Sequence, residues 1–265
     1  MRRFRRLHGL GNIIMLLPVL RKLSESTGPV VLETRREWAE VLSSLVTGIE
    51  FTDEAAEGAL NLDALTGGLR PTGHRTDEFA GIVGVGGPFE PAVFNVPEAW
   101  REEFHDYKGS VVLAPEAGHD ARQWPREKLG VLADRLKGSP LVLTGLEGGD
   151  GLPSDHDLRG RLSIRDLIAL LSVARALVTM DSGALHLAMS VGLPSIAIFS
   201  GIDPAFRIRP DQRVSVLQAD MDCCPCNKRE SCNELYPCLA RIEPELVLGK
   251  LGEIEKLQGR EIIRV

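Results

Sequence analysis

The chain has 265 residues, a hydrophobic fraction of 43%, a charged fraction of 26% and a formal net charge of −6 at pH 7. This composition is typical of a globular protein with a buried core. A net negative charge argues against general nucleic-acid binding, which needs a basic surface. Apolar runs such as residues 13–17 and 195–199 are far shorter than the roughly 20 residues that span a bilayer, so no transmembrane segment is expected.

The N-terminal segment superficially resembles a signal peptide, because several arginines precede an apolar stretch over residues 13–20. That stretch contains Pro18, runs into Arg21 and has no small-residue cleavage site, so we interpret it as part of the mature protein. The five cysteines all lie within residues 223–238, whereas a disulfide-stapled secreted domain spreads them through a much shorter chain. The sequence therefore predicts a cytoplasmic protein.

Short apolar strands alternate with amphipathic helices along the chain, which is typical of a parallel α/β sheet. After a first strand, the expected strands are residues 29–33, 82–85, 111–114, 141–144, 176–180 and 195–199. The expected helices begin at Ile13, Pro125 and Ser163 or cover residues 35–46, 184–191 and 244–257, and residues 52–81 are expected to be irregular. A charged, aromatic segment divides this pattern, so we predict Rossmann-like domains at 1–96 and 110–265 with a linker at 97–109.

The turn His8-Gly9-Leu10-Gly11-Asn12 lies between the first strand and the helix that follows it. Its two glycines let the backbone approach a ligand, and a helix N-terminus offers free N–H groups to an anionic or polyhydroxy molecule. A tight turn that binds nothing also uses glycine, so the pattern alone leaves both interpretations open.

A second polar turn, Asp181-Ser182-Gly183, lies at the end of a strand and opens a helix that carries His186. Open α/β sheets bind ligands at this position, and the serine and glycine can present backbone N–H groups to a diphosphate. The alternatives are that Asp181 only caps the helix and that His186 is an ordinary core histidine.

Two further strand-to-helix loops contain residues that suit a phosphate or sugar ligand. Arg122 can bind a phosphate through two nitrogens, although a solvated surface arginine is the alternative. Gly201 and Asp203 lie in a turn directly after a strand, which is also ordinary loop chemistry.

Together these motifs resemble glycosyltransferase family 9, the ADP-heptose:lipopolysaccharide heptosyltransferases and their relatives. The residues that carry the resemblance are Trp124-Pro125, Asp181-Ser182-Gly183 with His186, Gly192-Leu193-Pro194 and Gly201-Ile202-Asp203-Pro204, in that order. The likeness covers residues 111–245 and, earlier in the chain, the Gly11-Asn12 turn with Pro18 and Leu20.

The resemblance implies a glycosyltransferase-B fold of two Rossmann-like domains facing a cleft, with a reduced N-terminal domain. The C-terminal domain would bind a nucleotide-sugar, with an ADP-sugar favoured, and the N-terminal domain, including Gly11 and Asn12, an acceptor. It implies that Asp181, Ser182 and Gly183 meet the donor diphosphate near His186. It also implies that Arg122 replaces a phosphate-binding lysine, and that Gly201 and Asp203 help form the donor pocket.

Asn12 departs from the family pattern, because the resemblance implies an aspartate there as the base that deprotonates the acceptor. An amide takes no proton at neutral pH. Either another group is the base, or Asn12 only positions the acceptor, or the chain is not a competent transferase. Glu116, His119 and His8 are the candidate bases by their chemistry and their places in loops.

The cysteine segment contains enough thiolates for a tetrahedral zinc or iron site. The predicted structural ligands are Cys223, Cys226, Cys232 and Cys238, which leaves Cys224 spare, while disulfides and free thiols are the alternatives. Some protein-modifying relatives in the resembled family hold iron with four cysteines.

The sequence thus predicts a glycosyltransferase that moves a heptose-like sugar from a nucleotide-sugar to a carbohydrate, lipid-linked or protein hydroxyl, with no cofactor for the chemistry. One alternative is a non-catalytic member that binds nucleotide or sugar. Another is a nucleotide-sugar epimerase of the same fold. A Rossmann dehydrogenase is disfavoured, because no strand is followed by a convincing G-x-G-x-x-G unit.

Overall fold

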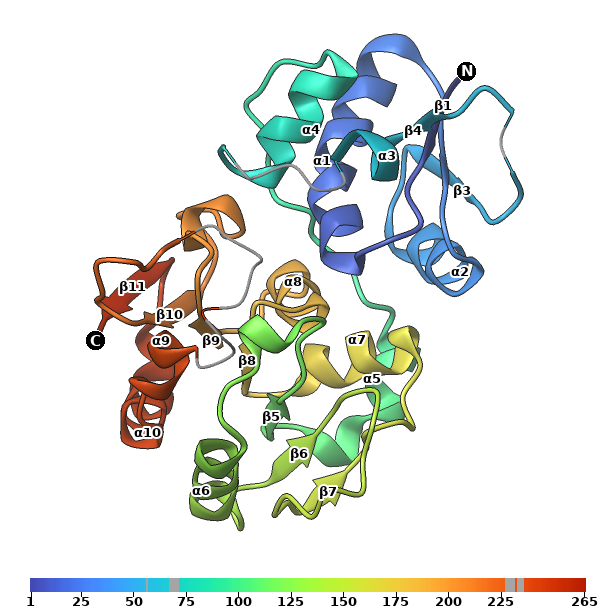
Figure 1. Cartoon of the computed structure of the whole chain (residues 1–265). Helices are drawn as coiled ribbons and strands as arrows, with labels where there is room; N and C mark the ends of the chain where they lie inside the picture. Colours follow the sequence, from blue (N-terminus) through green and yellow to red (C-terminus); the bar gives the residue numbers. More distant parts are fainter. Residues whose placement is uncertain (56, 67–71, 227–231, 233–235) are drawn as a thin grey trace. The chain divides into compact units, whose positions relative to one another are not determined.

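The computed structural model describes residues 1–55, 57–66, 72–226, 232 and 236–265. The chain divides into two compact units, Met1–Asn95 and Val96–Val265, and each contains its own parallel sheet (Figure 1). Within these residues, no helix is both long and apolar enough to cross a membrane.

Unit 1 contains a parallel sheet of four strands among its described residues, in the order β3-β2-β1-β4. The strands are β1 (Arg2–Arg5), β2 (Val30–Glu33), β3 (Ile49–Thr52) and β4 (Leu60–Asn61). The helices are α1 (Leu10–Thr27), α2 (Arg36–Leu45), α3 (Leu62–Thr66) and α4 (Arg75–Val83). The prediction for residues 52–81 was therefore wrong, because this segment contains β4, α3 and most of α4.

Helix α1 forms much of the unit 1 core, because the side chains from Ile13 to Leu20 are buried and the helix packs against α4.

The predicted strand at 82–85 was wrong, because residues 82 and 83 belong to helix α4. Phe79, Ala80 and Val83 recur with helical spacing and form the buried face of α4. The helix ends at Gly84, whose φ of 78° is costly for other residues.

Unit 2 contains a larger parallel sheet, which in its described residues has seven strands in the order β11-β10-β9-β8-β5-β6-β7. The strands are β5 (Val111–Ala114), β6 (Leu141–Leu143), β7 (His156–Asp157), β8 (Ala176–Met180), β9 (Ser195–Phe199), β10 (Val214–Gln218) and β11 (Glu261–Arg264). Its α-helices are α5 (Glu98–Glu103), α6 (Arg126–Leu136), α7 (Ile164–Val173), α8 (Gly183–Ser190), α9 (Pro237–Ala240) and α10 (Pro244–Glu253). Its 3-10 turns are η1 (His105–Tyr107), η2 (Asp120–Arg122), η3 (Pro204–Phe206) and η4 (Ile254–Lys256).

The predicted elements of unit 2 are largely confirmed. Strands β8 and β9 have the expected bounds, and Ser163 and Asp166 form a capping box at the start of α7. The structure differs at the C-terminus, where β11 follows the last helix and pairs with β10. The expected linker at 97–109 lies in unit 2, since α5 packs against α7.

Both sheets reverse their strand order at one place. In unit 1 the chain builds outward from β1 through β2 to β3 and then returns to place β4 on the other side of β1. In unit 2 it builds from β5 through β6 to β7 and returns to place β8 beside β5. Ligands of open α/β sheets bind beyond the strand ends at such switch points. Polar residues that follow the β1/β4 and β5/β8 pairs are therefore the first candidates for ligand binding.

Candidate active site

The loops that follow β5 and β8 bring Arg122 and Asp181 together, although 59 positions separate them in the chain. Arg122 Nη1 donates to the carbonyl oxygen of Asp181 at 3.1 Å and lies 3.3 Å from its Oδ2. Arg207, on the segment after η3, places its Nε 3.9 Å from Asp181 Oδ1. Asp181 is buried, so this carboxylate orients two cations at the unit 2 switch point.

The Arg122 side chain keeps 30% of its surface exposed, whereas the Arg207 side chain keeps 10%. A partly exposed guanidinium whose position is fixed by a buried carboxylate is well suited to bind an anionic group. In the sequence Arg207 lies just beyond the turn that contains Gly201 and Asp203. Its place near Asp181 depends on the path of the chain after β9.

His186 lies in α8 and is buried next to the same charges. The pKa of its imidazole is lowered to about 4, mainly because the ring is buried; the Asp181 carboxylate opposes this shift, and Arg207 and Arg122 add to it. The ring is therefore neutral at pH 7. It can hydrogen-bond a ligand, but it does not add a positive charge.

Ser182 is the N-cap residue of α8, and its hydroxyl lies 3.0 Å from Thr179 Oγ1. Thr179 in turn donates to the carbonyl oxygen of Ala114 at the end of β5, so the two switch-point strands are joined directly below the turn. Ser182 and Gly183 are partly exposed at the helix start. The free backbone N–H groups of a helix N-terminus attract an anion.

The loop after β9 is supported from beneath by Gln218, a fully buried residue of β10. Its Nε2 donates to the carbonyl oxygens of Ser200 at 2.5 Å and Ile202 at 2.8 Å. Within this loop Gly201 is half-buried, and Asp203 Oδ1 accepts from the N–H of Ala205 at 2.9 Å to cap η3. The turn chemistry expected for Asp203 is present, and the loop follows the strand next to β8.

Glu116 and His119 stabilise loops of unit 2. Glu116 accepts hydrogen bonds from the backbone N–H of Leu146 at 2.7 Å and of Glu147 at 3.0 Å. His119 Nδ1 accepts from the N–H of Ala121 at 3.2 Å, and its ring is exposed. Both groups therefore fix the loops after β5 and β6, and Glu116 uses both carboxylate oxygens to do so.

A pocket of about 710 Å³ lies beside these loops. Its lining includes Glu116, Gln123, Trp124, Glu147, Arg159 and Tyr236. Trp124 is anchored through a hydrogen bond from its Nε1 to the carbonyl oxygen of Ile242 at 3.1 Å, and Arg159 is fixed by Asp150 and Asp157. The size and mixed polarity of the pocket suit a small organic ligand.

In unit 1, Asn12 lies in the first turn of α1 and Gly11 is buried beside it. A Cβ atom at Gly9 would lie 2.7 Å from Asn12 Nδ2, so the amide covers the backbone of the turn. Gly9 has a φ of 74°, which explains the glycine at this N-cap position.

The four predicted metal ligands are not gathered in the part of the chain that the structure describes, where no group of three or more His, Cys, Asp or Glu side chains could hold a metal ion. Cys223 and Cys232 are exposed and Cys238 is buried. Much of the segment, residues 227–231 and 233–235, lies outside the described residues. Cys224, which the sequence left spare, is hydrogen-bonded to Cys238. This hydrogen bond raises the pKa of Cys224 and lowers the pKa of Cys238 to about 7.

The family model of glycosyltransferase family 9 (heptosyltransferase) matches residues 90–237. The chain belongs to this family. The match covers Arg122, Asp181, His186 and the loop at 200–203, so the resemblance inferred from those motifs is confirmed. The β1/β4 switch point lies outside the matched residues.

Similarity to individual proteins is lower in sequence than in fold. Lipopolysaccharide heptosyltransferase 1 of Pseudomonas aeruginosa is 29% identical over 136 residues, which are 46% of this chain and 36% of that protein. The chain therefore matches well under half of the length of this curated relative. A family 9 glycosyltransferase from Veillonella parvula DSM 2008 has a TM-score of 0.71 at 17% identity, over 95% of this chain and 96% of that one.

The iron-containing dodecameric glycosyltransferase TibC from enterotoxigenic Escherichia coli H10407 has a TM-score of 0.76 at 14% identity, over 97% of this chain and 78% of that one. TibC has also been solved in complex with ADP-D-beta-D-heptose. These structural likenesses confirm the predicted α/β glycosyltransferase fold for this family 9 chain.

Proposed function

We propose that this family 9 chain transfers a sugar from a nucleotide-sugar donor to an acceptor hydroxyl, and that unit 2 binds the donor. The observation that carries the proposal is the cluster of Arg122, Asp181 and Arg207 at the β5/β8 switch point, next to the N-terminus of α8. A cation fixed by a buried carboxylate and a helix N-terminus both favour a diphosphate.

These groups also suit the chemistry of transfer. When the bond from the sugar to the diphosphate breaks, negative charge builds up on the leaving phosphate oxygen. Arg122 and the backbone N–H groups at Ser182 and Gly183 are already oriented, so they stabilise that charge without reorganisation. His186 stays neutral there and can donate or accept a hydrogen bond.

We infer that the donor is an ADP-sugar of the heptose type, with its nucleoside in the pocket of about 710 Å³ beside Trp124. The family match and the ADP-D-beta-D-heptose bound by TibC support this choice. The acceptor class in this proposal is a carbohydrate, lipid-linked or protein hydroxyl, bound on the side of unit 1. The cytoplasmic location expected from the sequence stays part of the proposal.

Calorimetry with ADP and with ADP-heptose tests donor binding, and release of ADP from ADP-heptose tests turnover. We expect binding of both ligands and ADP release. Binding without any ADP release would favour a non-catalytic family member. Conversion of ADP-heptose into an isomeric ADP-sugar would favour an epimerase.

A further inference from the structure

One wall of the pocket of about 710 Å³ comes from the end of the cysteine segment and the start of α9. Tyr236 and Leu239 line the pocket from this side, and all of its lining residues belong to unit 2. Tyr236 is part of none of the motifs that indicate the family. An aromatic side chain thus lies on the wall of the pocket in which the nucleoside is proposed to bind.

The backbone of Tyr236 is left-handed, with a φ of 34° and a ψ of 56°. Among the residues that the structure describes, Tyr236 is the only one other than glycine with a positive φ. This conformation is unfavourable for an L-amino acid, because it brings Cβ too close to the following carbonyl oxygen. Such strain persists only where the surroundings hold it, and it is frequent at ligand-binding sites.

The residues after Tyr236 hold it in this conformation. Pro237 begins α9, and the next two residues, Cys238 and Leu239, are buried in the core of unit 2. The N–H of Leu239 donates to the carbonyl oxygen of Tyr236 at 3.0 Å. Tyr236 itself is half-buried and packs against the same core, so its side chain has a fixed place beside the pocket.

The two arginines in the described lining of the pocket are already paired with carboxylates. Arg159 Nη1 lies 2.6 Å from Asp150 Oδ1, and its Nη2 lies 2.7 Å from Asp157 Oδ2. Arg126 Nη1 lies 2.7 Å from Asp150 Oδ2. A phosphate group would meet a carboxylate beside each of these cations, so the pocket suits an uncharged part of a ligand.

Leu146 adds an apolar surface to the same pocket. It is 87% exposed, more than any other large hydrophobic residue among those described, and it lines the pocket. Its N–H donates to Glu116 Oε2 at 2.7 Å, which fixes the backbone of the loop after β6. A ligand that covers an apolar side chain so open to water gains hydrophobic free energy.

Trp124 and Tyr236, the aromatic residues in the described lining, differ in their accessibility. Trp124 is 2% exposed, and its hydrogen bond to Ile242 keeps it in the core. Tyr236 keeps accessible surface. Nucleobases stack on accessible aromatic rings, because every base has a flat π-face. Tyr236 is therefore the residue of this pocket that is suited to a planar, uncharged base.

We propose that the nucleobase of the donor stacks on the ring of Tyr236, an inference that rests on the proposed function. The stack needs the ring and not the hydroxyl group. It holds the nucleoside of the donor, while Arg122 and the N-terminus of α8 bind the diphosphate. Affinity for the base and affinity for the diphosphate then depend on different residues of unit 2, and substitution separates them.

The test is calorimetry on the full chain with ADP, and with inorganic pyrophosphate as a competitor of ADP. Loss of a base–aromatic stack lowers affinity roughly 5- to 150-fold. We expect the Kd of ADP to rise by that factor in Tyr236→Ala, while the Kd of pyrophosphate stays within about twofold. Tyr236→Phe keeps the ring, so its Kd for ADP should stay within about twofold of the wild-type value.

Tyr107→Ala is the matched control, because Tyr107 is the other tyrosine of the chain. It belongs to η1, makes an edge contact with the His156 ring and is absent from the described lining of the pocket. The Kd of ADP should therefore stay at the wild-type value in this variant.

Equal affinities of the wild type and Tyr236→Ala for ADP would overturn the assignment. Equal losses for ADP and pyrophosphate would also overturn it, because they would indicate general damage to unit 2. A loss for ADP-heptose with an unchanged Kd for ADP would place the ring at the sugar instead of the base. A wild-type chain that binds neither ADP nor ADP-heptose would refute the proposed donor site itself, and this failure is visible without any variant.

Tyr236→Gly separates the ring from the backbone strain. Glycine adopts the left-handed conformation without steric cost, so the Tm of this variant should be at least as high as that of Tyr236→Ala. Its Kd for ADP should be raised as much as in Tyr236→Ala, because both variants lack the ring. Recovery of ADP affinity in Tyr236→Gly would assign the effect to the backbone and would overturn the stack.

Discussion

Arg122 contacts Asp181 through both the backbone and the side chain of the aspartate, at 3.1 Å to the carbonyl oxygen and 3.3 Å to Oδ2. The two residues follow neighbouring strands, β5 and β8. Since the guanidinium group of Arg122 contacts both the main chain and the carboxylate of Asp181, the position of this group depends on the whole turn after β8. The cation of the proposed donor site is therefore in place before any ligand arrives.

Arg122→Ala should weaken binding of ADP by about 1.5–3 kcal/mol, the range for a hydrogen bond to a charged group. This corresponds to a Kd roughly 10- to 150-fold higher, which calorimetry measures directly. Arg135→Ala is the control, because that arginine lies on α6 and pairs with Glu245 at 3.7 Å. Equal affinities in the wild type and Arg122→Ala would remove this residue from the donor site.

His186 should make the stability of the protein depend on pH. Its pKa is about 4 in the folded chain and near 6.5 in the unfolded chain, so as the pH falls through this window only the unfolded state gains the proton. The free energy of unfolding should drop by about 3 kcal/mol between pH 7 and pH 4 on this account. His186→Gln should lose that part of the pH dependence in denaturant titrations, whereas His105→Gln should keep it.

Ser163→Ala should cost about 1 kcal/mol of stability, because the capping box at the start of α7 loses one of its two hydrogen bonds. Ser172→Ala in the same helix is the matched control, since its hydroxyl only donates back to the carbonyl oxygen of Ala169. In urea denaturation, the free energy of unfolding of the control should lie within about 0.5 kcal/mol of the wild-type value. A Ser163 variant as stable as the control would contradict the capping argument.

The structural metal that the sequence predicts at the cysteine segment can be tested by elemental analysis. Protein purified without chelator should contain about one equivalent of zinc or iron per chain in elemental analysis. Cys232→Ser should lose the metal, and Cys224→Ser should retain it. Metal-free protein with five freely titratable thiols would contradict the metal site. That result would not affect the proposed donor site, because none of the residues proposed to contact the donor is a cysteine.

The sequence predicted most of unit 2 because its central strands are short apolar runs buried on both faces and bounded by turn residues. Unit 1 was harder to predict. Its apolar residues at 79, 80 and 83 form one face of a helix. The segment at 82–85, taken alone, also has the apolar pattern of a short strand. Strand β11 alternates between exposed and half-buried residues at a sheet edge, so its sequence carries little hydrophobic signal.

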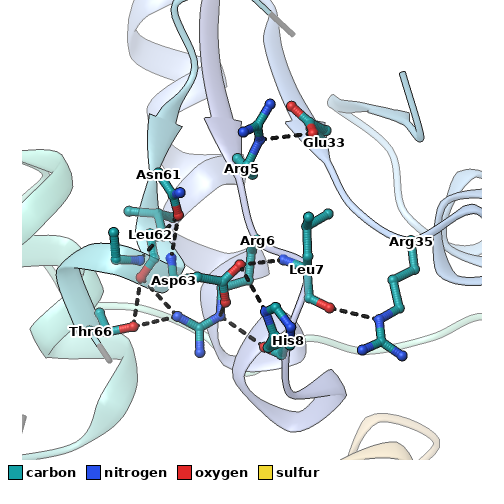
Figure 2. A network of polar contacts seen from close by, with 11 residues as sticks. Arg5, Arg6, Leu7, His8, Glu33, Arg35, Asn61, Leu62, Asp63 and Thr66 are labelled. Carbon is teal, nitrogen blue, oxygen red and sulfur yellow. Dashed lines mark hydrogen bonds and ion pairs between the residues drawn. The ribbon is translucent and has the colours of Figure 1, made fainter. Parts of the chain in front are cut away.

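The donor-side residues were predictable because each follows a strand and belongs to a short motif. Gln218 and Asp63 were not, since their contacts join distant segments of the chain. Asp63 illustrates the limit, because nothing near it in sequence indicates that β4 pairs with β1 and brings its carboxylate to Leu7 (Figure 2). A periodic pattern indicates which face of an element is buried, whereas the partner of a buried charge depends on strand order.

Gln218 has one more contact, because its Oε1 accepts a hydrogen bond from Arg264 of β11. A single amide therefore connects the last strand of the chain to the carbonyl oxygens of Ser200 and Ile202. Lifting residues 261–264 away from β10 would deprive that amide of one anchor and loosen the loop that contains Gly201 and Asp203. A bulky fusion at the C-terminus is thus a poor choice for binding studies of this protein, and a tag at the other end leaves this connection intact.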